Sequence, residues 1–240
     1  KLSEDLFSLV EGKDRLALSI LVNFDNNYNI TNYEIVESVI NVDKKLSYKD
    51  ADENYDKNEL LIKLLKTTQY LKNLRLSRGA VIFNLPELKI KVTEDKKVVL
   101  SKYKQDSQTQ QLISELMILS NSIVGEYCFK NKISCIYRSQ EEPLEIIDLN
   151  SNPNIIISMY RQRRFMKKSE VSLIPSSHYG LGLKFYTQIT SPIRRYSDLV
   201  IHRQIKYFLN NNKTLYTDEQ IKEVINFSEH SLYVSNLIQR

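Results

Sequence analysis

The segment from Tyr186 to Lys206 constrains the fold of this 240-residue chain more than any other. A polar stretch ends in Thr190-Ser191-Pro192, and a run of helix-forming residues follows it. Serine caps helix N-termini and proline suits the first helical turn, so we predict a helix from Ser191 to about Leu209. Its first exposed side chains would be Arg194 and Arg195. Because a helix N-terminus carries unpaired N–H groups and a partial positive charge, two guanidinium groups beside it suit a phosphate.

Helical spacing leaves two interpretations of Arg194 open. It predicts a buried stripe made of Ile193, Tyr196, Leu199, Val200 and Tyr207. Arg194 and Asp198 would then lie one turn apart on the opposite side. In the first interpretation they form a surface ion pair worth about 0.3 kcal/mol. In the second, Arg194 faces a scissile phosphate and stabilises the charge that develops on it during transfer.

Composition and cysteine use narrow the class of protein. The chain is 42% hydrophobic and 26% charged, as in an ordinary globular protein. It has no apolar run of the roughly 18 residues that a membrane span needs, and no signal-peptide pattern, so we expect no membrane partner. Cys128 and Cys135 form no CxxC pair and the three histidines are scattered, which argues against a zinc site. Sparse cysteine indicates a cytoplasmic protein or one of an organellar matrix or stroma.

Periodicity predicts a mixed α+β fold with short strands and several long helices. The expected strands are 15–22, 32–42, 80–84, 87–93, 98–102 and 133–138, and the expected helices are 57–75, 107–130, 155–168, 191–209 and 218–240. The chain starts at Lys1 without an initiator methionine and stops at Arg240 inside a helical pattern. We therefore expect residues 1–240 to be a fragment of a longer polypeptide.

The region around Arg194 resembles the RNB family, the ribonuclease II and ribonuclease R exoribonucleases. The matching stretches are His178-Tyr-Gly-Leu-Gly-Leu183, Tyr186-Thr187, Thr190-Ser-Pro-Ile-Arg-Arg-Tyr196, Asp198-Leu199 and His202-Arg203. The resemblance implies that Arg194 is the catalytic arginine. It also implies that Arg195, Thr190 and Ser191 help to hold the RNA backbone. It extends over nearly all of residues 1–240, which would form the second part of an RNB catalytic domain.

Two further residues match positions with which RNB enzymes grip the RNA 3′ end. Glu115 falls on the apolar side of its expected helix, where it is either a rim carboxylate paired with a lysine or an acceptor for a ribose hydroxyl. Its surroundings resemble the family's EExM-x-x-AN helix, with Ser114 and Ser120 as departures. Tyr48 by itself reads as a packing residue, but it matches the tyrosine of the family's R-L-(S/T)-Y motif, with Lys45 in place of arginine.

A basic segment and an acidic segment can each be interpreted either as a solvated surface or as a binding site. Tyr160–Lys168 interleaves cations with aromatic residues, so it is either a solvated helix face or a surface on which RNA phosphates and bases rest. The acidic side chains of 50–59 read mainly as a solvated helix start, with a metal site as the alternative. These are Asp50, Asp52, Glu53, Asp56 and Glu59.

RNB enzymes hold magnesium with an aspartate cluster, D-x(5)-D-x-D-D, which this chain lacks. In the family those aspartates precede the segment that matches Leu2–Ser8. We therefore expect the Mg²⁺ ligands and the flanking OB-fold RNA-binding domains to lie outside residues 1–240, and we assign no metal ligand within them.

The resemblance implies part of a hydrolytic 3′→5′ exoribonuclease that releases nucleoside 5′-monophosphates from single-stranded RNA. The isolated fragment is expected to bind magnesium poorly and to be inactive. The alternative is a non-catalytic RNA-binding or regulatory protein on a degenerate RNB scaffold. A third hypothesis, an α+β module unrelated to RNA, predicts no salt-sensitive binding to oligoribonucleotides.

Overall fold

The computed structural model describes residues 7–83, 85, 87–93, 95, 97–103, 107–148 and 154–238. Its strands are β1 (Asp14–Phe24), β2 (Ile30–Asn41), β3 (Glu87–Val92), β4 (Val98–Tyr103), β5 (Tyr137–Ser139) and β6 (Glu170–Ser172). Its helices are α1 (Tyr48–Asn54), α2 (Glu59–Ser77), α3 (Gln108–Lys130), α4 (Ile155–Phe165), α5 (Tyr196–Asn211) and α6 (Asp218–Ile238). The short 3-10 turns η2 (Tyr55–Lys57) and η3 (Tyr179–Leu181) complete the order. The predicted mixed α+β class, with short strands and several long helices, is confirmed.

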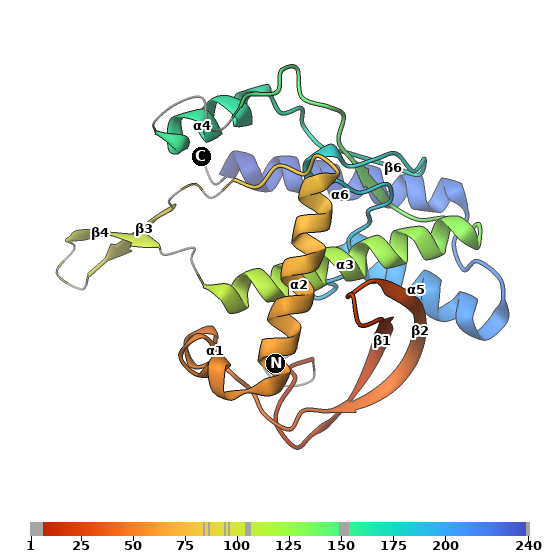
Figure 1. Ribbon diagram of the computed structural model, residues 1–240. Helices are drawn as coiled ribbons and strands as arrows, with labels where there is room; N and C mark the ends of the chain where they lie inside the picture. The colour runs from red at the N-terminus through yellow and green to blue at the C-terminus, as the bar shows by residue number, and fades with distance from the viewer. Residues whose placement is uncertain are drawn as a thin grey trace.

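The strands form three separate antiparallel pairs, β1–β2, β3–β4 and β5–β6. The β1–β2 turn is closed by Asp25, whose carboxylate accepts hydrogen bonds from the backbone N–H groups of Asn27 and Asn29 at 2.8 Å. Tyr28 takes the left-handed conformation that this turn requires, with φ of 62°. Figure 1 shows β3–β4 extending away from the helices, whereas the β1–β2 ribbon curls beside them.

Helix α3 is the central element of the interior. Ser107 caps it by accepting a hydrogen bond from the N–H of Gln110, and α2 crosses it in Figure 1. The main apolar cluster joins the second half of α3 to β2, β5, α5 and α6, and it includes Val124, Cys128, Cys135, Val200, Ile201, Ile205 and Ile221. Both cysteines are unpaired thiols with at most 1% of their surface exposed.

By length and composition α3 is also the one helix, among those described, that could span a membrane. Several of its side chains are buried in the protein, including those of Glu115 and Asn121, and a core helix passes the same test. We therefore describe α3 as a core helix.

The predicted start of α5 is wrong. The N–H groups of Arg194 and Arg195 both donate to the carbonyl of Ser191, at 3.2 and 3.0 Å, and so close a separate turn. Arg195 is extended, with φ of −124° and ψ of 115°, and the helix begins at Tyr196. Ser191 therefore does not cap α5, and Arg194 lies in a turn before the helix.

The predicted buried stripe of α5 is also wrong, except for Val200. Ile193, Tyr196, Leu199 and Tyr207 are exposed, whereas the face toward the core carries Asp198, Val200, Ile201, Gln204 and Ile205. Gln204 can be buried in the core because its side-chain amide forms hydrogen bonds with both its nitrogen and its oxygen. It donates to the carbonyls of Ser134 and Tyr216 and accepts from the N–H groups of Leu215 and Tyr216.

Two predicted strands are shorter or absent. Residues 80–83 are irregular, because the N–H of Ala80 bonds to the carbonyl of Arg75 and the N–H of Val81 bonds to that of Gly180. Residue 84 lies outside the described residues. Of the expected strand 133–138, only the part from Tyr137 pairs, with β6, and α4 ends at Phe165 instead of reaching residue 168.

Candidate nucleic-acid interface

The turn before α5 is held by one buried carboxylate. Asp198 has no exposed surface, and its Oδ2 accepts hydrogen bonds from the N–H of Ser191 at 2.9 Å and from Nη2 of Arg195 at 2.7 Å. The same Nη2 lies 3.5 Å from Oγ1 of Thr190. The predicted surface ion pair between Arg194 and Asp198 is therefore wrong, since Asp198 is buried and pairs with Arg195.

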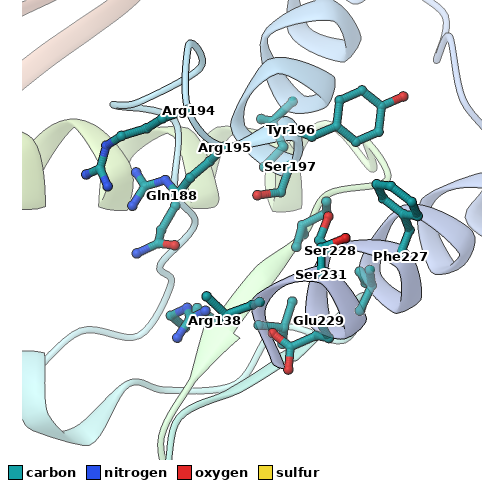
Figure 2. A pocket seen from close by; sticks show the side chains of 15 residues that line it. Arg138, Gln188, Arg194, Arg195, Tyr196, Ser197, Phe227, Ser228, Glu229 and Ser231 are labelled. Atoms are coloured by element: carbon teal, nitrogen blue, oxygen red, sulfur yellow. The ribbon is translucent and has the colours of Figure 1, made fainter. Parts of the chain in front are cut away.

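Arg194 projects from this turn into a cationic cavity of about 340 Å³. Arg138, Gln188 and Arg195 line the same cavity, and residues of α6, including Glu229, line it as well. Figure 2 shows the guanidinium groups of Arg194 and Arg195 gathered beside the Gln188 amide, with Arg138 below them. Asp198 neutralises Arg195, and Glu229 opposes one of the two remaining guanidinium groups. The small positive balance that is left favours an anion in the cavity.

Within this cavity each arginine is anchored differently. Arg138 donates from Nη1 to Oγ of Ser169 at 2.8 Å, and Arg195 is held by Asp198. Nε of Arg195 is buried and has no partner among the described residues. The side chain of Arg194 is exposed and makes no ion pair within the described ranges. It is therefore the arginine that is free to turn toward a ligand.

Glu115 and Tyr48 line a second cavity, of about 590 Å³, together with Lys72, Arg75 and Gln111. The prediction that Glu115 lies on the apolar side of α3 is confirmed, since only 7% of its surface is exposed. Its partner is Arg75 of α2, which donates from Nε to Oε2 at 3.0 Å and from Nη2 to Oε1 at 2.5 Å. The alternative of a rim carboxylate paired with a lysine is therefore wrong.

Tyr48 is the first residue of α1 and is 46% exposed, so its ring is free to contact a ligand. Helix α1 is fastened to α3 by Asp52, whose Oδ1 accepts from the N–H of Thr109 at 3.0 Å and from its hydroxyl at 2.8 Å. Burial acts to raise the pKa of Asp52, but hydrogen bonds from Ser107 and Thr109 outweigh it and hold that pKa below its usual value. The helices that carry Tyr48 and Glu115 are thus joined by hydrogen bonds.

Among the residues that the structure describes, none lines both cavities. The structure thus places Arg194 in one cavity and Tyr48 with Glu115 in another. Thr190 and Ser191 contact Arg195 and Asp198 in the turn that carries Arg194, but they are not among the described residues that line either cavity. The chain links the sites, because Gly180 and Leu181 line the second cavity and the segment after them leads to Arg194. Asn121 of α3 steadies that segment by accepting a hydrogen bond from the N–H of Ile189 at 3.0 Å.

Arg75 and Arg138 are two arginines of the sites to which the sequence analysis assigned no role. Arg75 follows Thr68 and Leu71 at helical spacing, and all three are buried. A charged residue on the apolar stripe of a helix implies a buried partner, and that signal was present in the sequence. For Arg138 the signal was the pair Tyr137-Arg138, which resembles the Y/F-R pair of RNB proteins, although Gln140 departs from the motif that follows it there.

The described residues do not fit a magnesium site. Among them, no group of three or more His, Cys, Asp or Glu side chains lies close enough to hold a metal ion. Four of the five acidic residues of 50–59 are engaged singly: Asp50 with Ser47, Asp52 with Thr109, Glu53 with Lys49 and Glu59 with Lys63.

The basic segment 160–168 forms the exposed face of α4 and the residues after it. Tyr160 is 50% exposed, and the side chains of Arg161, Arg163 and Arg164 are also exposed. Phe165 is half-buried, which leaves Tyr160 as the better placed aromatic ring for stacking on a base. A role of this face in RNA binding stays a prediction.

His178 gives the fold a distinct pH dependence. Burial, aided by the charge of Arg138, lowers its pKa to about 4, and its Nδ1 is buried without a partner among the described residues. In the unfolded chain the pKa is about 6.5, so between these values the unfolded state binds the extra proton. We expect the free energy of unfolding to fall as the pH drops from about 6.5 to about 4, by at most about 3 kcal/mol.

Urea unfolding at a series of pH values measures this effect. His178→Gln should flatten the pH dependence in that range, whereas His230→Gln, at an exposed position of α6, should leave it unchanged. Equal slopes for the wild-type chain and His178→Gln would contradict the assignment.

Comparison with known proteins gives one family and a consistent set of relatives. The family model of the RNB domain matches residues 1–211. The chain is 32% identical over 243 residues to an uncharacterized ribonuclease of Synechocystis sp., with 97% of the chain and 36% of that protein covered. It is 32% identical over 221 residues to the chloroplastic/mitochondrial ribonuclease II of Arabidopsis thaliana, with 87% and 27% covered. The chain thus spans about a third of the length of these relatives.

Solved structures share the fold of this chain. RNase R of Mycoplasma genitalium in complex with ribose-methylated single-stranded RNA superposes with a TM-score of 0.85 at 21% identity, with 98% of this chain and 44% of that chain covered. Yeast Ssd1, a pseudonuclease, superposes with a TM-score of 0.73 at 19% identity, with 94% and 33% covered. At such identities the likeness concerns the fold alone.

Proposed function

The chain belongs to the RNB domain family, and on that premise we propose that it is part of a hydrolytic 3′→5′ exoribonuclease. Its substrate would be single-stranded RNA and its products nucleoside 5′-monophosphates. The observation that carries the proposal is the cavity lined by Arg138, Arg194 and Arg195. The names of the relatives, ribonuclease R and ribonuclease II, also support the proposal.

In the proposed reaction Arg194 acts on the scissile phosphate. During phosphoryl transfer, negative charge spreads over the phosphate oxygens, and a guanidinium placed beside them lowers the energy of the transition state. Asp198 holds the turn that carries Arg194, so that the backbone from which the Arg194 side chain projects is already in place. Arg195, Thr190 and Ser191 would bind the neighbouring backbone of the RNA.

Recognition of the RNA end is proposed for the second cavity. Glu115 would accept a hydrogen bond from a ribose hydroxyl, which DNA lacks, and the exposed ring of Tyr48 would contact the terminal nucleotide. The RNase R of M. genitalium is described with single-stranded and with double-stranded RNA. That description supports RNA as the ligand of this chain as well.

The cofactor and the cellular location are further parts of the proposal. We propose Mg²⁺ as the cofactor of the whole protein, held by residues outside this chain, and assign no step of the reaction to it. We propose a cytoplasmic or organellar location, and the chloroplastic/mitochondrial name of the Arabidopsis relative supports the organellar alternative.

One observation favours a second candidate, a non-catalytic RNA-binding protein. Yeast Ssd1, a pseudonuclease, has the same fold. A protein of this kind would keep the cationic cavity and the RNA-contacting residues while lacking the metal-dependent chemistry.

A hydrolysis assay separates the candidates. The whole protein with magnesium and a 5′-labelled single-stranded oligoribonucleotide should give a ladder that shortens from the 3′ end, with nucleoside 5′-monophosphates as products. Residues 1–240 alone should bind the oligonucleotide in a salt-sensitive manner and hydrolyse none of it. RNA binding without hydrolysis by the whole protein would favour the second candidate. Normal turnover by residues 1–240 would refute the placement of the metal chemistry outside them.

A further inference from the structure

We propose that Arg75 is a positioning residue that determines the preference for ribose over deoxyribose by fixing the carboxylate of Glu115. This inference rests on the proposed function and deepens it. The residue that would touch the sugar is Glu115, and Arg75 would act through it. The proposal follows from three features: the geometry of the ion pair, the backbone that encloses Arg75, and the cavity that both side chains line.

Arg75 of α2 and Glu115 of α3 form a bidentate ion pair between the two helices. Nε and Nη2 of Arg75 donate to the two different oxygens of Glu115, at 3.0 and 2.5 Å. Each residue is 7% exposed, so water competes little for either partner. A fork of this kind fixes the plane of the carboxylate and uses one lone pair of each oxygen, which leaves the others to accept a further hydrogen bond.

Arg75 is itself held on two sides by backbone. Its Nη1 donates to the carbonyl of Leu181 at 2.9 Å, and its own carbonyl accepts from the N–H of Ala80 at 3.0 Å. Gly182 passes so close that a Cβ atom there would lie 2.7 Å from the carbonyl oxygen of Arg75. The guanidinium therefore has little freedom to turn, and neither has the carboxylate that it holds.

The pair lines the cavity that also contains Tyr48 and Lys72. A lone carboxylate in that position would repel the phosphates of an approaching RNA, whereas a carboxylate neutralised by Arg75 can accept a hydroxyl hydrogen without that penalty. A fixed acceptor also discriminates more strongly than a mobile one. When the substrate lacks the hydroxyl, the acceptor stays unpaired and cannot turn away to another partner.

The first test uses Arg75→Lys in the whole protein, with Arg78→Lys as the matched control at the exposed end of the same helix. Lysine keeps the charge but loses the fork and cannot also reach Leu181. The measurement is kcat/KM for two oligonucleotides that differ only in ribose or deoxyribose at the 3′-terminal nucleotides. We expect the ribose preference to fall roughly tenfold or more in Arg75→Lys and to stay unchanged in Arg78→Lys.

A double-mutant cycle with Glu115→Gln tests whether Arg75 acts through Glu115. Glu115→Gln should lower the preference by itself, and adding Arg75→Lys should lower it little further. An equal loss of activity on both oligonucleotides would overturn the inference and leave Arg75 a structural residue. Additive effects on the preference would overturn it as well.

The remaining outcomes are also decisive. If Arg75→Lys does not fold, as judged by thermal unfolding, Arg75→Gln combined with Glu115→Gln replaces it with a neutral pair that can still hydrogen-bond. A folded double variant with the full wild-type preference in equilibrium binding of the two oligonucleotides would overturn the inference.

A wild-type protein that hydrolyses neither oligonucleotide would refute the proposed function, and the inference with it. A wild-type protein that degrades RNA while Arg75→Lys keeps the whole preference would refute the inference alone.

Discussion

Replacing Arg194 with alanine in the whole protein should lower kcat for RNA hydrolysis by about 10²- to 10³-fold, with a much smaller change in RNA affinity. The reason is that Arg194 is exposed in the cationic cavity and makes no ion pair within the described ranges. Its charge is thus available to the phosphate, and it contributes most when the negative charge is at its largest. Single-turnover hydrolysis and equilibrium binding of the same oligoribonucleotide measure the two quantities separately.

The matched control is Arg203→Ala. Arg203 lies on α5 as an exposed cation, 5.5 Å from the ring centre of Tyr216, and it does not line the cavity of Arg194. Its loss should leave kcat nearly unchanged. If Arg194→Ala weakened binding while hydrolysis of the bound RNA continued at the normal rate, Arg194 would be a contact that positions the RNA and not a catalytic residue.

Replacing Asp198 with asparagine should lower the free energy of unfolding of this chain by about 2–3 kcal/mol. Asp198 is fully buried, and one of its oxygens accepts from both the Ser191 N–H and the Arg195 guanidinium. Asparagine has nearly the same shape but no charge, so the guanidinium loses its counter-charge inside the protein. Urea unfolding followed by circular dichroism measures the difference.

The control for this variant is Asp56→Asn, because Asp56 is exposed on the short turn η2. It should change stability by less than about 0.5 kcal/mol. In the whole protein, Asp198→Asn should also slow hydrolysis, since the turn that presents Arg194 loosens. Unchanged stability of Asp198→Asn would show that the turn is held by other contacts.

The sequence was most informative where regularity is local. Alternating apolar residues predicted β1 and β2, and apolar spacing predicted α2 and α3 within a few residues. In these segments, the pattern of each element is read from neighbouring residues alone. The strand predicted for 80–84 failed because the N–H groups of Ala80 and Val81 bond to carbonyls of α2 and of the turn at Gly180, not to a second strand.

The candidate sites were less accessible to sequence reasoning, because their geometry depends on contacts between distant segments. The partner of Glu115 lies 40 residues earlier in the chain, on another helix. At Ser191 the local rule for helix starts was misleading. The Ser191 carbonyl closes a separate turn, and its N–H is bound by Asp198 from inside the helix. Neither contact leaves a periodic trace in the sequence.

The two buried cysteine thiols allow the opening of the core to be timed by their reaction with an alkylating reagent. Contact with Cys135 and burial both raise the pKa of the Cys128 thiol, and an alkylating reagent attacks only the thiolate. Cys128 has no exposed surface and Cys135 has 1%, so neither sulfur can be modified until the core cluster around them opens. The rate of alkylation in native buffer therefore records how often the core opens, without denaturant and without an introduced probe residue.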